Sequence, residues 1–191
     1  MASLKGSQTE KNLLASFAGE SQARNRYTYF ASVAKKEGFE QISAIFCDTA
    51  DNEKEHAKVF FKYLEGGMAE ITALYPAGVI GDTLANLKAA AEGEKAEWGS
   101  IYPDFAKVAK EEGFTEVYNS FSQIAQVEKE HEARYNLLAE RVAAGQVFAR
   151  PEPIKWHCRN CGRVIGAKEA PEICPACKHP QAYFEPFAEN Y

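Results

Sequence analysis

Two segments decide the fold: ISAIFCDTADNEKEHAKVFFKY at residues 42–63 and VYNSFSQIAQVEKEHEARYNLL at residues 117–138. In both, apolar side chains recur at alternating intervals of four and three residues, which is the spacing of one buried face of an α-helix. A glutamate and a histidine three residues apart interrupt each face, as Glu53-x-x-His56 and Glu128-x-x-His131. Because burying an ionised carboxylate without a partner is very unfavourable, something cationic must lie between these helices.

Two further predicted helices supply more carboxylates. Glu20 lies on the apolar face of one, and Glu94 and Glu97 lie on that of the other. One glutamate from each of two helices, with Glu-x-x-His from each of the other two, is the pattern of di-iron carboxylate bundles. Oxygen and imidazole ligands suit iron or manganese. A single Glu-x-x-His pair is usually solvated, as we expect for Glu130 and Glu132, but two copies in register argue against that interpretation.

The two segments belong to an internal repeat. Phe30-Ala31 and Glu37-Gly38-Phe39 recur 75 positions later as Phe105-Ala106 and Glu112-Gly113-Phe114, in step with the two Glu-x-x-His motifs. Two helical hairpins related by duplication predict a pseudo-twofold axis between them. A site on that axis receives similar ligands from both halves.

The repeat is out of step by one residue in the third helix. Seven positions separate Glu20 from Tyr27, whereas eight separate Glu94 from Tyr102. A single insertion in a helix with a constrained register is often absorbed as a π-bulge. We therefore expect a π-bulge between Glu94 and Tyr102 that turns Glu97 toward the site. We also expect Tyr27 and Tyr102 to donate hydrogen bonds to ligand carboxylates.

The fold class that follows is mainly α, a ferritin-like four-helix bundle over residues 1–146. Glycines at positions suited to helix C-caps divide it into four helices, expected at residues 4–36, 39–65, 80–111 and 114–144. The connections at Gly38 and Gly113 are tight. A long connection at residues 66–79 between the second and third helices is the single crossover expected of a ferritin-like bundle.

The composition changes after residue 146, where Pro151 and Pro153 indicate a linker to a second domain at residues 153–191. Its four cysteines form two C-x-x-C pairs, which predict a rubredoxin-like site with four thiolate ligands: Cys158, Cys161, Cys174 and Cys177. Four sulfur ligands suit zinc as well as iron, so a structural zinc ribbon stays open. Cys47 stands apart, and we expect it to be a small buried apolar residue.

Charge and hydropathy exclude some classes of function. The net charge of −5 does not indicate nucleic-acid binding. No apolar run has the length of about 18 residues that a membrane span needs. The polar residues 1–12 lack the apolar core of a signal peptide, so a cytoplasmic protein is expected.

Together these motifs resemble rubrerythrins over essentially the whole chain. The resemblance implies that two irons are bridged by Glu53 and Glu128. It implies that Glu20 is a terminal ligand of one iron and that Glu94 and His131 are terminal ligands of the other.

The resemblance also implies a ligand exchange. Glu97 binds the oxidised site, and His56 replaces it in the reduced site. Four carboxylates balance the positive charge of two ferrous ions. When oxidation adds further positive charge, a fifth carboxylate compensates it better than an imidazole does.

The function implied by the resemblance is reduction of hydrogen peroxide to water, with electrons passed from the rubredoxin-like iron. An external redox protein or reductase supplies the electrons, and a head-to-tail homodimer brings one subunit's tail to the other's bundle. Two alternatives stay open. One is a ferroxidase or iron-storage protein, against which the cysteine tail argues, and the other is a binding protein with a zinc ribbon.

Overall fold

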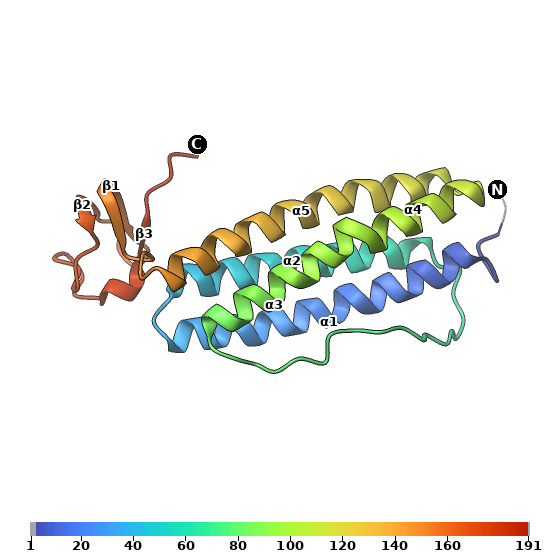
Figure 1. Ribbon diagram of the computed structural model, residues 1–191, viewed down its shortest axis with the longest axis horizontal. Coiled ribbons are helices and arrows are strands. Elements are labelled where there is room, and N and C mark those ends of the chain that lie inside the picture. Colours follow the sequence, from blue (N-terminus) through green and yellow to red (C-terminus); the bar gives the residue numbers. More distant parts are fainter. Residues whose placement is uncertain (1–2, 191) are drawn as a thin grey trace.

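A computed structural model describes residues 3–190 as a long helical bundle with a small β-domain beyond one end (Figure 1). Residues 1–2 and 191, which the predicted domain limits include, lie outside the described residues. Within the described chain, no helix has the length and apolar character needed to cross a membrane.

Four long helical segments form the bundle, as the glycine pattern predicts. They are α1 (Gln8–Lys36), α2 (Glu40–Tyr63), the continuous series α3 (Thr83–Ala96), η1 (Glu97–Ile101) and α4 (Tyr102–Glu111), and α5 (Thr115–Ala143). The first helix begins four residues later than expected, because Gly6 has a positive φ of 81° and Ser7 caps the helix by accepting from the N–H of Glu10. The third begins at Thr83 because Asp82 caps it.

Each repeat contributes one tight helical hairpin. α1 packs along α2, and α3 with α4 packs along α5. Gly38 and Gly113 adopt φ values of 84° and 85° at the two corners, where a left-handed residue ends the first helix of the hairpin. The residues before them join the halves: Glu37 accepts from the N–H of Thr83, and Glu112 accepts from the N–H and hydroxyl of Thr9. Each repeat thus caps the first helix of the other.

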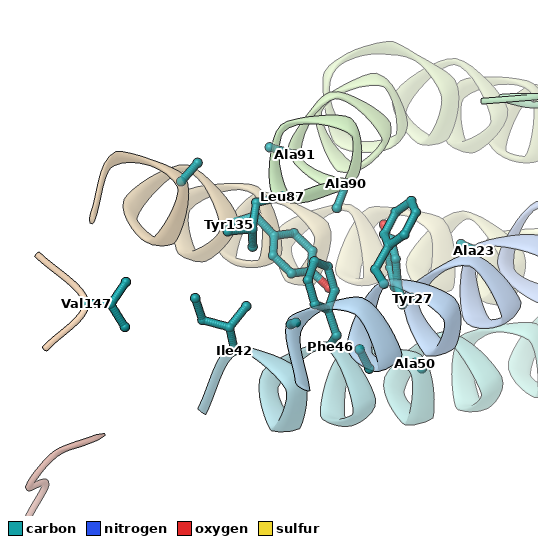
Figure 2. Packing of buried hydrophobic residues seen from close by; sticks show 14 residues of the cluster. Ala23, Tyr27, Ile42, Phe46, Ala50, Leu87, Ala90, Ala91, Tyr135 and Val147 are labelled. Atoms are coloured by element: carbon teal, nitrogen blue, oxygen red, sulfur yellow. The ribbon is translucent and has the colours of Figure 1, made fainter. Parts of the chain in front are cut away.

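The core consists of two aromatic clusters separated along the bundle axis. Figure 2 shows the cluster nearer the β-domain, where Tyr27, Phe46 and Tyr135 pack with ring centroids 5.2 to 6.2 Å apart. The repeat places their counterparts in the other cluster, where the centroids lie 4.9 to 5.7 Å apart: Tyr102, Phe121 and Phe60. These clusters exclude water from both ends of the central layer of polar residues.

The crossover between the halves has no regular secondary structure over residues 64–82. It runs along the outside of the bundle beside α1, from the end near the N-terminus to the start of α3 (Figure 1). Tyr75 ties it to the bundle, since its hydroxyl donates to the carbonyl of Ala15 at 2.7 Å. The rest of the crossover exposes apolar side chains such as those of Leu74 and Val79.

The C-terminal part is a three-stranded antiparallel sheet in the order β2–β1–β3, formed by β1 (Ala149–Cys158), β2 (Val164–Glu169) and β3 (Phe184–Pro186). A short 3₁₀ helix, η2 (Gln181–Tyr183), precedes β3. Pro151 and Pro153 lie within β1 rather than in a separate linker. Because proline has no N–H to donate, the pairing of β1 with β2 is irregular between Ala149 and Ile154. The domain limits 1–146 and 153–191 stay a prediction.

Candidate metal centres

The four helices bring four of the five predicted carboxylates and both imidazoles together between the two aromatic clusters. Their possible ligand atoms form two groups, each with all atoms within 4.8 Å of one another: Glu20, Glu53, His56 and Glu128 in the first, and Glu53, Glu94, Glu128 and His131 in the second. Glu53 and Glu128 belong to both groups. The arrangement therefore offers two adjacent cation positions with two shared carboxylates.

Both histidines face the site through Nδ1. The Nδ1 atom of His56 lies 2.9 Å from a Glu128 oxygen and 3.0 Å from a Glu53 oxygen. The Nδ1 atom of His131 lies 2.8 Å from Glu128 and 3.6 Å from Glu94. The i, i+3 spacing on α2 and α5 directs each glutamate and its histidine to one point.

The donor set fits a pair of metal ions. Among the possible ligand atoms of this cluster, six are fully buried and lack a hydrogen-bond partner within residues 3–190: Glu20 Oε2, Glu53 Oε1, Glu94 Oε2, both oxygens of Glu128, and His131 Nδ1. The imidazole of His131 lies at ion-pair distance from carboxylate oxygens in this group, but these contacts lack hydrogen-bond geometry, so the ligand atoms converge on a shared space. Buried polar atoms are rarely left this way unless a ligand completes them. Carboxylate oxygens with imidazole nitrogens are ligands that iron accepts.

Without a cation, Glu20, Glu94 and His56 bind protons more tightly than the free side chains do. Burial, together with the charges of Glu97 and Glu53, holds the pKa of Glu20 well above its usual range. Burial likewise raises the pKa of Glu94 to about 8. Burial opposes the charged form of His56, but Glu128 and Glu53 outweigh it and raise its pKa to about 9. Metal ions replace such protons on binding, since the ligands must be deprotonated.

Tyr27 and Tyr102 each donate a hydrogen bond to a buried carboxylate of the cluster, as the sequence predicts. The hydroxyl of Tyr27 donates to Glu94 at 2.5 Å, and that of Tyr102 donates to Glu20 at 2.5 Å. Each tyrosine therefore bonds to the glutamate of the other repeat, not to the one on its own helix. Both rings are almost fully buried in the aromatic clusters, which fixes the direction of the bonds.

The predicted π-bulge is confirmed. The chain between Glu94 and Tyr102 contains a π-helix at Glu97–Ile101, and the N–H of Tyr102 donates to the carbonyl of Glu97, five residues earlier. Glu97 is half-buried, and the charges of Glu94, Glu128 and Glu53 add to burial in raising its pKa. Its carboxylate stands outside both ligand groups, whereas His56 lies inside one.

Two side chains behave differently from the sequence expectation. Glu132, expected to be solvated, is half-buried and accepts from the indole N–H of Trp98 at 2.7 Å, which ties the π-helix to α5. Trp98 was not identified from the sequence, where no periodicity distinguishes it from a core residue. Cys47, expected to be buried, is exposed, because it follows the buried Phe46 and therefore points away from the core.

The four cysteines of the small domain also converge. Their sulfur atoms lie within 4.8 Å of one another, and the Cys158–Cys177 and Cys161–Cys174 distances are both 3.7 Å. The backbone N–H of His179 lowers the pKa of Cys177 to about 6. The thiolate form that a metal needs is thus favoured at this position. Four sulfurs in this arrangement suit iron or zinc.

Two turns of the same shape present the cysteine pairs. The N–H of Gly162 donates to the carbonyl of Cys158 at 2.8 Å, and the N–H of Lys178 donates to that of Cys174 at 2.9 Å. Gly162 has a φ of 79°, and Lys178 has a φ of 63°. Glycine adopts this conformation readily, whereas lysine does so at an energetic cost. The second turn is therefore strained where the first is not.

Known proteins match the chain along its whole length. A family model described as rubrerythrin matches residues 11–139, and one described as the rubredoxin-like domain of rubrerythrin matches residues 156–185. The rubrerythrin of Porphyromonas gingivalis is 64% identical over 189 residues, which cover 99% of this chain and 94% of that protein. The curated rubrerythrin of Nitratidesulfovibrio vulgaris is 56% identical and aligns over 100% of both chains.

A solved structure supports the same architecture. Nigerythrin in its fully reduced, all-ferrous state matches with a TM-score of 0.64 and 29% identity, over 96% of this chain and 91% of that one. Both parts of the chain therefore lie within the span of this match.

Proposed function

Because the chain belongs to the rubrerythrin family, we propose that it is a non-haem di-iron peroxidase that reduces hydrogen peroxide to water. The family is one of iron-containing oxidoreductases, so the carboxylate and histidine cluster holds two iron ions and the four cysteines hold a third. The single observation that carries the proposal is that one chain contains both the carboxylate–histidine cluster and the four-cysteine cluster. In this proposal the first reacts with peroxide and the second supplies electrons.

The proposed ligands follow from the two groups of donor atoms. Glu53 and Glu128, which belong to both groups, would be shared between the two ions. Glu20 with His56 completes one position, and Glu94 with His131 completes the other. The iron of the second site is held by Cys158, Cys161, Cys174 and Cys177.

When bound, the two ferrous ions supply the two electrons that break the O–O bond. The protein residues prepare the site for this chemistry. Tyr27 and Tyr102 fix the terminal carboxylates by short hydrogen bonds, so these ligands need little rearrangement during turnover. The aromatic clusters exclude water on both sides of the site. We include both tyrosines, Glu97 and His56 among the residues that act in catalysis.

Glu97 and His56 exchange in this proposal. The reduced site uses the neutral imidazole of His56, whose Nδ1 atom lies among the ligand oxygens. The oxidised site would take the carboxylate of Glu97, which lies on the π-helix and belongs to neither ligand group. Glu97→Ala is expected to leave the ferrous site intact and to destabilise the ferric one. A ferric site with unchanged iron affinity and spectrum would contradict the exchange.

The four cysteines would hold the iron that supplies electrons to the carboxylate site. The small domain lies beyond one end of the bundle (Figure 1). The carboxylates lie between the two aromatic clusters of the bundle. Transfer at short range therefore requires a head-to-tail homodimer, in which the tail of one subunit approaches the bundle of the other. An external redox protein or reductase supplies electrons to the four-cysteine domain. In this proposal the protein acts in the cytoplasm against oxidative stress.

A stopped-flow experiment tests the proposal. The fully reduced, anaerobic protein is mixed with one equivalent of hydrogen peroxide, and the visible spectrum is followed. Rapid oxidation of the carboxylate site and slower appearance of ferric four-thiolate colour are expected. In Cys174→Ser the second phase should disappear while the first persists, and Cys47→Ser should retain both phases. Inert peroxide with consumption of dioxygen and ferrous iron would favour the ferroxidase alternative instead.

A further inference from the structure

A cavity lies beside the carboxylate site, under the crossover. Its volume is about 240 Å³, and α1, the π-helix and the crossover residues 73–76 enclose it. Glu97, Tyr27 and Tyr102 form part of its wall. Because the two tyrosines bond to Glu94 and Glu20, this wall is also the edge of the carboxylate site.

The cavity is much larger than hydrogen peroxide requires. One water molecule occupies about 30 Å³ of liquid, and a dry apolar cavity of about 150 Å³ is large enough to bind benzene. The volume of about 240 Å³ therefore has room for an aromatic ring and a peroxide group together.

The lining separates into an apolar and a polar part. Ala15, Ala23, Pro76, Ile101 and Phe105 present only carbon to the cavity. The polar side chains are those of Glu97, Tyr27 and Tyr102 at the site, Tyr75 on the crossover, and Ser16, Gln22 and Arg26 on α1. Among these, Ser16 is 4% exposed, and its hydroxyl has no hydrogen-bond partner within residues 3–190.

We propose that this cavity binds the organic group of alkyl and aryl hydroperoxides, so that the substrates include organic hydroperoxides as well as hydrogen peroxide. This inference rests on the peroxidase function proposed above. The organic group occupies the apolar part, and the peroxide group lies toward Glu97. The hydroxyl of Ser16 is available to the bound oxygen atoms.

The reaction balances as ROOH + 2 H⁺ + 2 e⁻ → ROH + H₂O. The O–O bond breaks, the two electrons come from the two ferrous ions of the loaded site, and the alcohol and water leave. The same four-cysteine iron and external donor return the electrons. On the crossover side of the cavity, the hydroxyl of Tyr75 donates to the carbonyl of Ala15, which holds residues 73–76 against α1.

Two measurements on the iron-loaded protein test the inference. The first compares oxidation of the reduced protein by hydrogen peroxide and by cumene hydroperoxide, with the product 2-phenylpropan-2-ol quantified. The second titrates 2-phenylpropan-2-ol, which cannot react, into the oxidised protein by calorimetry. We expect one alcohol formed for every two electrons, and saturable binding of one alcohol per chain.

A pair of variants locates the binding site. Ala15→Leu fills the cavity, and Ala18→Leu adds the same atoms at another half-buried position of α1 that does not line it. Ala15→Leu should lower the turnover of cumene hydroperoxide relative to that of hydrogen peroxide by roughly tenfold or more. It should lower the affinity for 2-phenylpropan-2-ol by a similar factor. The loss of apolar contact equal to even two methylene groups changes affinity by about that much. Ala18→Leu should leave both unchanged.

The outcomes are distinguishable. If hydrogen peroxide oxidises the protein and cumene hydroperoxide does not, the inference is overturned and the peroxidase function stands. If neither oxidises it, the peroxidase function fails and the inference fails with it. If both react and Ala15→Leu resembles the unmodified protein, the organic group binds elsewhere and the cavity assignment is wrong.

Discussion

The hydrogen bond between Tyr102 and Glu20 gives the sharpest test of how the bundle holds its carboxylates. Tyr102 is 1% exposed, and its hydroxyl donates to Glu20 at 2.5 Å. The other oxygen of Glu20 has no hydrogen-bond partner within residues 3–190. Tyr102→Phe therefore removes the only such bond that the described protein gives this fully buried carboxylate, while the ring keeps its packing against Phe60 and Phe121.

The expected magnitude follows from the loss of that single bond. Leaving a buried acceptor unsatisfied costs about 1–3 kcal/mol in the free energy of unfolding. In a chain of this size each kcal/mol lowers the melting temperature by about 2–4 °C, so we expect a decrease of about 2–12 °C in the metal-free protein. Because the bond also orients a proposed metal ligand, we expect ferrous iron to bind about 10–100-fold more weakly.

The assay combines thermal unfolding with an iron titration. Tyr27→Phe is the matched variant from the other repeat, since Tyr27 makes the equivalent bond to Glu94, and it should give effects of similar size. Tyr29→Phe is the control, because Tyr29 is 50% exposed. If Tyr102→Phe and Tyr29→Phe have the same melting temperature and iron affinity, the bond contributes nothing and the reasoning is refuted.

Three further predictions concern other parts of the molecule. Lys178→Gly should raise the free energy of unfolding of the small domain, measured with denaturant, by up to about 1 kcal/mol. A lysine in the left-handed conformation costs about 1–2 kcal/mol, and the greater flexibility of glycine in the unfolded chain offsets part of that gain. A loss of stability would contradict this. Glu112→Ala should lower the free energy of unfolding by about 1–2 kcal/mol through loss of the bonds to Thr9, whereas the exposed neighbour Glu111→Ala should be nearly neutral. In the metal-free protein, the free energy of unfolding should fall as pH rises from about 4.5 to about 8. The pKa of Glu94 in the folded state is raised to about 8, above its value in the unfolded chain. In that range the native state therefore holds a proton that the unfolded state releases. Melting curves of metal-free and iron-loaded protein over that range check the last prediction, which would be wrong if the metal-free protein gained stability with pH.

Much of the fold could be predicted from local patterns. The interval of three between Glu53 and His56 places both on one helix face, and a buried face that contains such charges requires a cation. The repeat of 75 positions then predicts a second copy of the same geometry. The offset of one residue between Glu94 and Tyr102 predicted the π-helix, because an extra residue in a helix of fixed register has few other places to go.

Contacts across the bundle were not predictable in the same way. The sequence indicated that Tyr27 and Tyr102 bond to carboxylates, but the pairing of Tyr27 with Glu94 and of Tyr102 with Glu20 depends on how the helices are aligned along their axes. The position of Glu97 outside both ligand groups likewise depends on how far the π-helix turns it.

The sequence by itself therefore determined which residues bear the chemistry, and the tertiary structure decided what each of them faces. Cys47 was expected to be buried and is exposed, because residue type predicts burial only on average. The cavity under the crossover has no sequence signal, since residues 73–76 have no periodicity and acquire a position only by packing on α1. Periodicity fixes the direction of a side chain about its own helix, whereas the neighbour that it meets depends on how separate helices and connections pack.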